Sequence, residues 1–249
     1  MKTALCVVAL AGCTSSVLGA ISQIDLKLRP WGSSDAWSDS LSLVSVGTAP
    51  IEVEVAAFYS WSSGYGFSTC VHNIVGSPYS AALGDSVTIL DRADSSFHPD
   101  GRVGNFNFGG QMQTVYHTGT SGVDANRFRI GAPANPNDVS AGGISIKQNS
   151  PPLLGTLFDT SNPAYAYHFK LSLSCYEQFA PRTVTIDAPL NKINSYRTYT
   201  TATSTTATDI FATLVASDPA TVDVNWVPSP GVPAFALIAA LGLGRRRRT

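Results

Sequence analysis

The chain has few charged residues, and residue patterns that carry chemistry are scarce. Asp, Glu, Lys and Arg make up 13% of its 249 residues. The four histidines lack the HxH or HExxH spacing of a zinc site, and no GxSxG motif places a serine nucleophile. Before residue 228, no segment has the 3.6-residue apolar period of an amphipathic helix. These absences argue against a zinc enzyme, a serine hydrolase and a helical fold.

Short alternating segments are frequent instead. Residues 51, 53 and 55 are apolar and alternate with Glu52 and Glu54, which we place on a solvent-facing sheet surface. The same two-residue period recurs over 168–175 and 221–226, and Gly/Pro turn signals separate such segments. Further candidate strands cover 24–28, 41–46, 67–74, 86–90, 112–117, 127–130, 144–147, 183–186 and 196–203. The pattern predicts an all-β fold with a single β-sandwich or jelly-roll-like domain over residues 21–226.

Residues 1–20 have the order of a secretory signal peptide. Lys2 precedes an apolar run, and small residues precede a cut after Ala20. One alternative stays open, because Leu10-Ala11-Gly12-Cys13 fits a lipobox, in which Cys13 becomes lipidated. Both interpretations predict export, with the Sec translocon as a partner.

The predicted body, residues 21–226, holds 11 basic and 17 acidic residues, a net charge of −6. This balance argues against nucleic-acid binding, which uses a basic surface. Cys70 and Cys175 are the two cysteines left in the body, and an oxidising compartment makes a disulfide between them a candidate. Two buried free thiols are the alternative.

Residues 227–249 combine a turn, an apolar run and a basic cluster. Pro228, Ser229, Pro230 and Gly231 form the turn, residues 232–244 are uncharged, and Arg245, Arg246, Arg247 and Arg248 follow. As a helix this run is about 20 Å long, less than the roughly 30 Å hydrocarbon core, but arginines can snorkel to the headgroups. The basic flank stays cytoplasmic, so the body would lie outside the membrane. A buried C-terminal helix is the alternative.

This order of parts resembles the PEP-CTERM sorting signal of Gram-negative bacteria, in a planctomycete-type variant. Pro228 and Pro230 match the two prolines and the arginines match the basic cluster, whereas Ser229 stands where the family has Glu. The resemblance implies an exosortase-like processing enzyme as partner. It also implies a short transmembrane helix, membrane retention or release to the cell surface, and association with an extracellular polysaccharide matrix. The body resembles uncharacterised members only, which implies no activity.

Aromatic and acidic residues supply the remaining candidate sites. Exposed rings can stack on sugars, so the tryptophans and tyrosine clustered near the N-terminus make a carbohydrate-binding module one alternative; core packing is the other interpretation. The candidate glycan contacts are Trp31, Trp37, Trp61 and Tyr65. Asp91, Asp94 and Asp100 form a weak calcium candidate without DxDxDG spacing. Carboxylates between Asp85 and Asp100 leave a glycan-acting hydrolase as a second alternative.

Taken together, these patterns predict a non-enzymatic protein without a cofactor. We expect it to be exported and attached to the membrane or the cell surface, with a structural or adhesive role in the bacterial envelope.

Overall fold

The computed structural model describes residues 22–90, 106–110, 115–117, 126–131, 144–175, 180–216 and 218–228. The predicted signal peptide, residues 229–249 of the predicted tail and the calcium candidates Asp91, Asp94 and Asp100 lie outside these ranges. Among the residues described, no helix has the length and hydropathy needed to cross a membrane.

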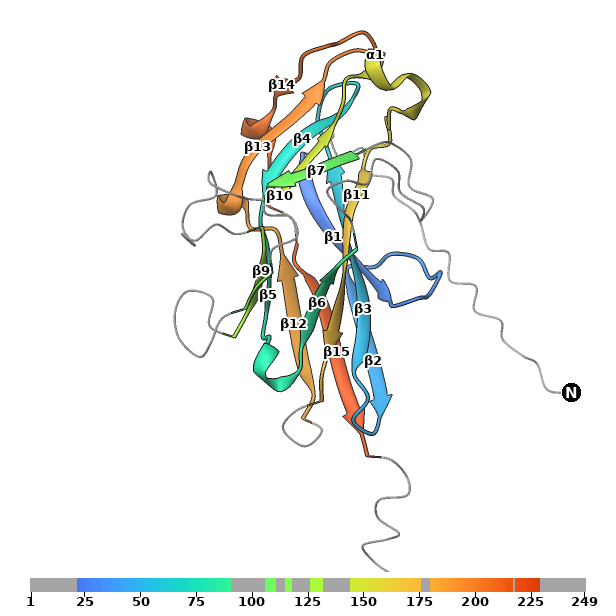
Figure 1. The fold of residues 1–249 in the computed structure, drawn as a ribbon, viewed down its shortest axis with the longest axis vertical. Helices are drawn as coiled ribbons and strands as arrows, with labels where there is room; N and C mark the ends of the chain where they lie inside the picture. Colours follow the sequence, from blue (N-terminus) through green and yellow to red (C-terminus); the bar gives the residue numbers. More distant parts are fainter. Residues whose placement is uncertain are drawn as a thin grey trace, which may run out of the picture.

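The described chain folds mainly into strands that form three sheets (Figure 1). The four-stranded sheet has the antiparallel order β1 (Gln23–Pro30), β3 (Ile51–Ser60), β11 (Ala164–Leu173) and β6 (Ser86–Ile89). The five-stranded sheet has the order β14 (Thr208–Asp209), β13 (Ile193–Tyr199), β4 (Gly66–His72), β10 (Ile144–Gln148) and β7 (Phe106–Gly110). The six-stranded sheet has the order β2 (Ser40–Val46), β15 (Ala220–Val227), β12 (Arg182–Asp187), β5 (Ile74–Ser77), β9 (Phe128–Ile130) and β8 (Val115–His117). Its β2–β15 pair is parallel.

Helical structure is confined to short turns in the described residues. They are α1 (Pro151–Leu154) and the 3₁₀ turns η1 (Ala81–Leu83), η2 (Gly155–Leu157), η3 (Leu190–Lys192) and η4 (Phe211–Thr213). The sequence pattern predicted no helix before residue 228, whereas the structure has the four-residue α1. It also missed β5, β7 and β14, whereas strands occur in each of the other predicted segments.

The five- and six-stranded sheets form one layer of a sandwich, and the four-stranded sheet forms the other. Only Asn73 separates β4 from β5, so the chain passes directly from one sheet of that layer to the next. In Figure 1 the five-stranded sheet lies towards the top and the six-stranded sheet towards the bottom. Tyr59 of β3 contacts Phe67 of β4, with ring centroids 5.0 Å apart, while Phe169 of β11 contacts Phe128 of β9 at 6.0 Å. The predicted β-sandwich class is confirmed to this extent.

Side-chain alternation positions the core between the two layers. On β1, residues 24, 26 and 28 are buried, and on β3 the odd-numbered residues 51–59 are buried, as the two-residue period predicts. The prediction is wrong for Glu54, which is 5% exposed although it lies on the outer face. Neighbouring side chains cover it, as described for the candidate site below.

A buried ion pair joins the two layers near the start of β12. The guanidinium of Arg182 donates to both carboxylate oxygens of Asp85, at 2.8 and 2.6 Å. The same carboxylate accepts the backbone N–H groups of Ser80 and Ser174, each at 2.9 Å. These additional hydrogen bonds offset the cost of burying the pair, and they fix the loop before β6, the end of β11 and the start of β12 together.

A buried histidine contributes a second polar contact between the layers. The Tyr59 hydroxyl lies 2.7 Å from His72 Nε2, and His72 Nδ1 lies 3.4 Å from the carbonyl of Asn73. Burial lowers the pKa of His72 to about 4. The ring is therefore neutral at pH 7, so that Nδ1–H donates to the carbonyl and Nε2 accepts from the tyrosine.

We expect Asp85→Ala to lower the free energy of unfolding by about 3–5 kcal/mol, because it leaves the Arg182 guanidinium buried without its counter-charge. Urea denaturation followed by circular dichroism measures the change. Asp209→Ala is the matched control, since Asp209 forms an exposed pair with Arg197 at 3.8 Å and should cost less than about 1 kcal/mol. Equal effects of the two substitutions would contradict the structural role of the buried pair.

The His72 site predicts a pH dependence of stability. The unfolded chain protonates His72 near pH 6.5 and the folded chain only near pH 4, so unfolding takes up a proton between these values. The free energy of unfolding should have its full value above pH 6.5 and should fall by about 3 kcal/mol as the pH approaches 4. Denaturation at pH 7.5 and 4.5 tests this against His72→Gln, whose stability should change less over the same interval. Identical pH dependence in both proteins would exclude the effect.

Candidate functional site

The outer face of the four-stranded sheet presents the polar and aromatic side chains that the core does not bury. Strand pairing arranges them in three rows across β1, β3 and β11, in which opposing side chains lie within contact distance. The rows are Asp25–Phe58–Tyr165, Lys27–Ala56–His168 and Arg29–Glu54–Lys170. The loop between β1 and β2 adds Trp31 and Trp37, and it projects from the sheet in Figure 1. We name this surface the tryptophan face.

An aromatic cluster forms one end of the tryptophan face. Phe58 and Tyr165 stack with ring centroids 5.0 Å apart, and Trp37 meets them edge-on at 5.8 and 5.5 Å. A bulge in β11 makes this cluster possible, because the register shifts between Tyr165 and Tyr167. In a regular strand both tyrosines would point the same way. Here Tyr167 is buried in the core, while Tyr165 joins the outer face.

Charged side chains occupy the neighbouring rows. Arg29 Nε donates to Glu54 Oε2 at 2.8 Å, and His168 Nε2 lies 3.8 Å from Glu54 Oε1. Lys170 donates to Glu52 at 2.9 Å. Together these partners explain why the Glu54 side chain is only 7% exposed on a face that was predicted to be solvated.

Two cation–π contacts connect the charged rows to the tryptophans. The Arg29 guanidinium lies 4.2 Å from the Trp37 ring centroid, and the Lys170 ammonium lies 5.0 Å from that of Trp31. Both contacts are within the range in which a ring face attracts a cation. The tryptophans are thus positioned by the charged side chains of β1 and β11, although they belong to a loop.

Backbone hydrogen bonds hold the loop at both ends. Leu28 and Ser38 exchange N–H···O bonds of 2.7 and 2.9 Å, and the Trp31 N–H donates to the carbonyl of Glu52 at 3.1 Å. Gly32 has a φ of 72°, which lets the chain turn directly after Trp31. Trp31 remains 41% exposed and Trp37 is half-buried.

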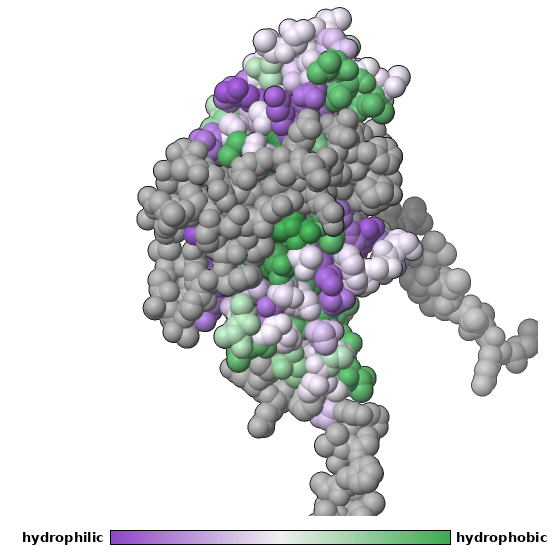
Figure 2. All heavy atoms as spheres, in the orientation of Figure 1, coloured by the Kyte–Doolittle hydropathy of each residue, from purple (hydrophilic) through white to green (hydrophobic). Residues whose placement is uncertain are grey.

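The ion pairs of the tryptophan face balance its charge. Lys27 pairs with Asp25 at 2.6 Å and also with Asp39. With the Arg29–Glu54 and Lys170–Glu52 pairs, three basic groups meet four acidic groups. Figure 2 shows hydrophilic residues gathered beside the projecting loop. The surface therefore offers hydrogen-bond donors and acceptors next to aromatic rings without a strong field of either sign.

The four aromatic residues predicted as glycan contacts do not form one surface. Trp61 is 3% exposed and packs in the core, so the prediction is wrong for this residue. Tyr65 is exposed, but it stacks on Phe158 at 5.7 Å and bonds to the Tyr199 backbone, beside the five-stranded sheet. Only Trp31 and Trp37 share a face. Sequence clustering could not separate these cases, because it does not show which way each ring points.

The predicted disulfide is absent, and both cysteines are free thiols. Cys70 pairs in register with Tyr196, whose ring contacts that of Tyr59. Tyr59 in turn pairs in register with Ala164, the first residue of β11. Cys175 lies two residues after the last residue of β11. A ten-residue strand spans about 33 Å, whereas bonded cysteines need Cα atoms within about 7 Å. The prediction is therefore corrected to a buried Cys70 and a half-buried Cys175.

The acidic candidates contribute no catalytic arrangement to the described residues. The Asp85 side chain is fully buried, and both of its oxygens are engaged by Arg182, so it is not available as a catalytic acid or base. In the ranges that the structure describes, no three His, Cys, Asp or Glu side chains are grouped as metal ligands. Asp91, Asp94 and Asp100 lie outside these ranges.

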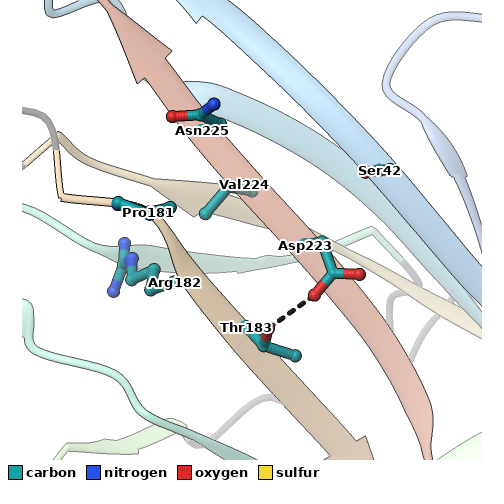
Figure 3. Close-up of a pocket in the computed structure, with 7 residues that line it drawn as sticks. All are labelled: Ser42, Pro181, Arg182, Thr183, Asp223, Val224 and Asn225. Atoms are coloured by element: carbon teal, nitrogen blue, oxygen red, sulfur yellow. Dashed lines mark hydrogen bonds between the residues drawn. The ribbon is translucent and has the colours of Figure 1, made fainter.

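An open hollow lies on the outer side of the six-stranded sheet (Figure 3). Its lining residues are Ser42, Pro181, Arg182, Thr183, Asp223, Val224 and Asn225. Thr183 donates a hydrogen bond to Asp223, the one carboxylate among these seven residues, and the Arg182 guanidinium is bound to Asp85. The hollow therefore lacks the carboxylate pair that glycoside cleavage uses.

No family model matches the chain, and no curated protein matches it. Several solved cohesin structures resemble it weakly. One is the sixth cohesin of scaffoldin B from Acetivibrio cellulolyticus, in complex with a Cel5 dockerin, at 9% identity and a TM-score of 0.33 over 84% of this chain and 99% of that chain. Another is the seventh ScaB type I cohesin from Pseudobacteroides cellulosolvens, at 8% identity and a TM-score of 0.33 over 78% and 94%. Similarities of this size assign neither a partner nor an activity to this chain.

Proposed function

We propose that this chain is an exported adhesive protein of the bacterial envelope, held at the membrane through residues 228–249, whose tryptophan face binds a neutral polysaccharide. One observation carries the binding role. Trp31 and Trp37, from a single loop, stand over a sheet face whose charges are already paired. Rings that are already held in place by cation–π contacts bind with little loss of conformational freedom, which favours recognition of an extended polymer.

Charge pairing favours a neutral ligand over an acidic one. An acidic polysaccharide is bound by basic groups that lack a nearby counter-charge, and here Arg29, Lys170 and Lys27 each face a carboxylate. Sugar hydroxyls, in contrast, both donate and accept, so they can bond to either member of such a pair. The exposed Trp31 ring and the Trp37 cluster supply the apolar contacts.

A hydrolytic role is a weaker proposal. Glu54 is the most enclosed carboxylate of the tryptophan face, and Arg29 bonds to it directly. A general acid must instead present its carboxyl group to the substrate, and the Glu54 side chain is only 7% exposed. We therefore assign binding without turnover to the tryptophan face.

The sequence supports the location proposed for the protein. Residues 1–20 favour export through the Sec translocon, and residues 232–244 with the four arginines favour anchoring. An exosortase-like enzyme is the proposed partner only for a chain whose tail is cut. Ser229 replaces the family's Glu, which favours a chain that keeps its tail in the membrane fraction.

We expect Trp31→Ala and Trp37→Ala each to weaken binding to a neutral polysaccharide at least about tenfold, or about 1.4 kcal/mol. Affinity electrophoresis in gels containing soluble cellulose, xylan or dextran derivatives measures retardation. Tyr65→Ala is the matched control, since it removes an exposed ring elsewhere. Retardation should also change little with salt, whereas binding of an acidic polymer should weaken. Equal losses in all three variants, or no retardation of the wild type by any neutral polymer, would refute the proposed ligand class.

The intact mass of protein from membrane and medium tests the proposed location. We expect a membrane species that begins at Ile21 and includes Arg245–Arg248. A species in the medium ending near residue 228 would show that the tail is removed, contrary to the expected anchor. A diacylglyceryl adduct on Cys13 would replace the cut after Ala20 with lipoprotein processing.

A further inference from the structure

The end of the molecule from which the tail continues has a distinctive surface. It consists of residues 44–50, at the end of β2 and the turn before β3, and residues 225–228, at the end of β15. We name it the β2–β15 pole. Neither segment contains Asp, Glu, Lys or Arg. Figure 2 shows hydrophobic residues gathered at this lower end of the molecule.

Hydrogen bonds fix the turn against the point where the chain leaves β15. The Gly47 N–H donates to the carbonyl of Val227 at 2.8 Å. The Trp226 indole donates to the carbonyl of Ala49 at 3.0 Å, and the Ser45 hydroxyl reaches the same carbonyl at 3.1 Å. The pole is therefore a fixed surface and not a loose end of the chain.

Apolar side chains project from this surface. Val44 is 65% exposed, Val46 is 58% exposed and Val227 is 37% exposed. Val46 and Val227 are register partners in the parallel β2–β15 pair, so they lie side by side. Single exposed valines need no explanation, but a group of three on two segments that contain no Asp, Glu, Lys or Arg is unusual for a surface that faces only water.

The tail limits how far this pole can stand from the membrane. Four residues, 228–231, separate Val227 from the first residue of the apolar run. A fully extended connection of that length reaches about 17 Å. The headgroup layer on each side of the hydrocarbon core is itself about 5–8 Å deep. Once the apolar run enters the bilayer, the pole must lie in or just above the headgroups.

We propose that the β2–β15 pole rests on the bilayer and that Val44, Val46 and Val227 contact the interfacial region of the lipids. This contact rests on the proposed anchor and adds a defined orientation to it. The turn between β13 and β14, at the other end of the molecule in Figure 1, then points away from the membrane. Apolar side chains gain by entering the interface, and the absence of charge removes the desolvation cost that a charged pole would have.

Fluorescent labelling at two threonines tests this orientation. Thr48→Cys places a probe at the pole, and Thr205→Cys places the same probe in the exposed β13–β14 turn. Both are made in a Cys175→Ser background of the exported chain, where the remaining Cys70 is buried. The labelled proteins are reconstituted into phosphatidylcholine vesicles containing a nitroxide headgroup lipid. We expect the lipid to quench the Thr48 probe at least about twofold more than the Thr205 probe, because only the pole lies within the short reach of the headgroups.

Vesicle flotation separates failure of the anchor from failure of the pole contact. A chain that floats, with both probes quenched equally, overturns the pole contact and leaves the anchor intact. A chain that does not float would refute the proposed anchor, and it would refute the pole contact as well, because that contact depends on the anchor. Shielding of the Thr48 probe without lipid, together with dimerisation in light scattering, would show that a second copy covers the pole and would also overturn the lipid contact.

Charged variants provide an independent check. Val46→Asp should reduce quenching of the Thr48 probe while the chain still floats, although the short connection keeps it above that of the Thr205 probe. Thr206→Asp, a matched exposed substitution beside the distal turn, should leave it unchanged. Undiminished quenching in Val46→Asp would contradict an apolar contact with lipid.

Discussion

The buried Asp85–Arg182 pair is the contact on which the relation between the two layers depends. Its carboxylate uses both oxygens on one guanidinium and also accepts backbone N–H groups from Ser80 and Ser174. Hydrophobic packing between sheets is non-directional and tolerates sliding, whereas this geometry admits one alignment. Because Ser174 directly follows β11, the pair also restricts the axial position of the strand that carries much of the tryptophan face.

The tryptophan face requires the exact register of β11 against its neighbouring strands. A slip of one position along β11 would move His168 and Lys170 to the core side and bring Phe169 to the outer face. The bulge at Ala166 then makes a local exception, since it turns Tyr165 outward beside Phe58 while Tyr167 stays buried. Bulges commonly redirect side chains next to functional surfaces. The aromatic cluster thus arises from one bulge in β11, whose remaining residues pair in regular register.

Alternation in the sequence predicted the strands and their buried faces wherever one side of a strand meets the core, as in 51–55 and 168–173. It did not predict β7, whose Phe-Asn-Phe-Gly-Gly sequence ends in two glycines of the kind that mark a turn. It also could not distinguish Trp61 from Trp31, since burial depends on which residues from distant strands cover a ring. The bulge, the enclosed Glu54 and the separation of the two cysteines all arise from pairing between strands, which a single sequence does not encode locally.

The proposed binding surface and the proposed anchor belong to different layers of the sandwich, so a force on the bound polymer must pass between strands to reach the tail. The tryptophan face lies on β1, β3 and β11, whereas the tail continues from β15 in the opposite layer. A polymer bound at Trp31 and Trp37 would load β2, which continues from the tryptophan loop and pairs in parallel with β15, so part of the force reaches the tail through that pair of strands. The rest of the force passes from β3 and β11 through the contacts between the layers, where the buried Asp85–Arg182 pair resists separation of the sheets.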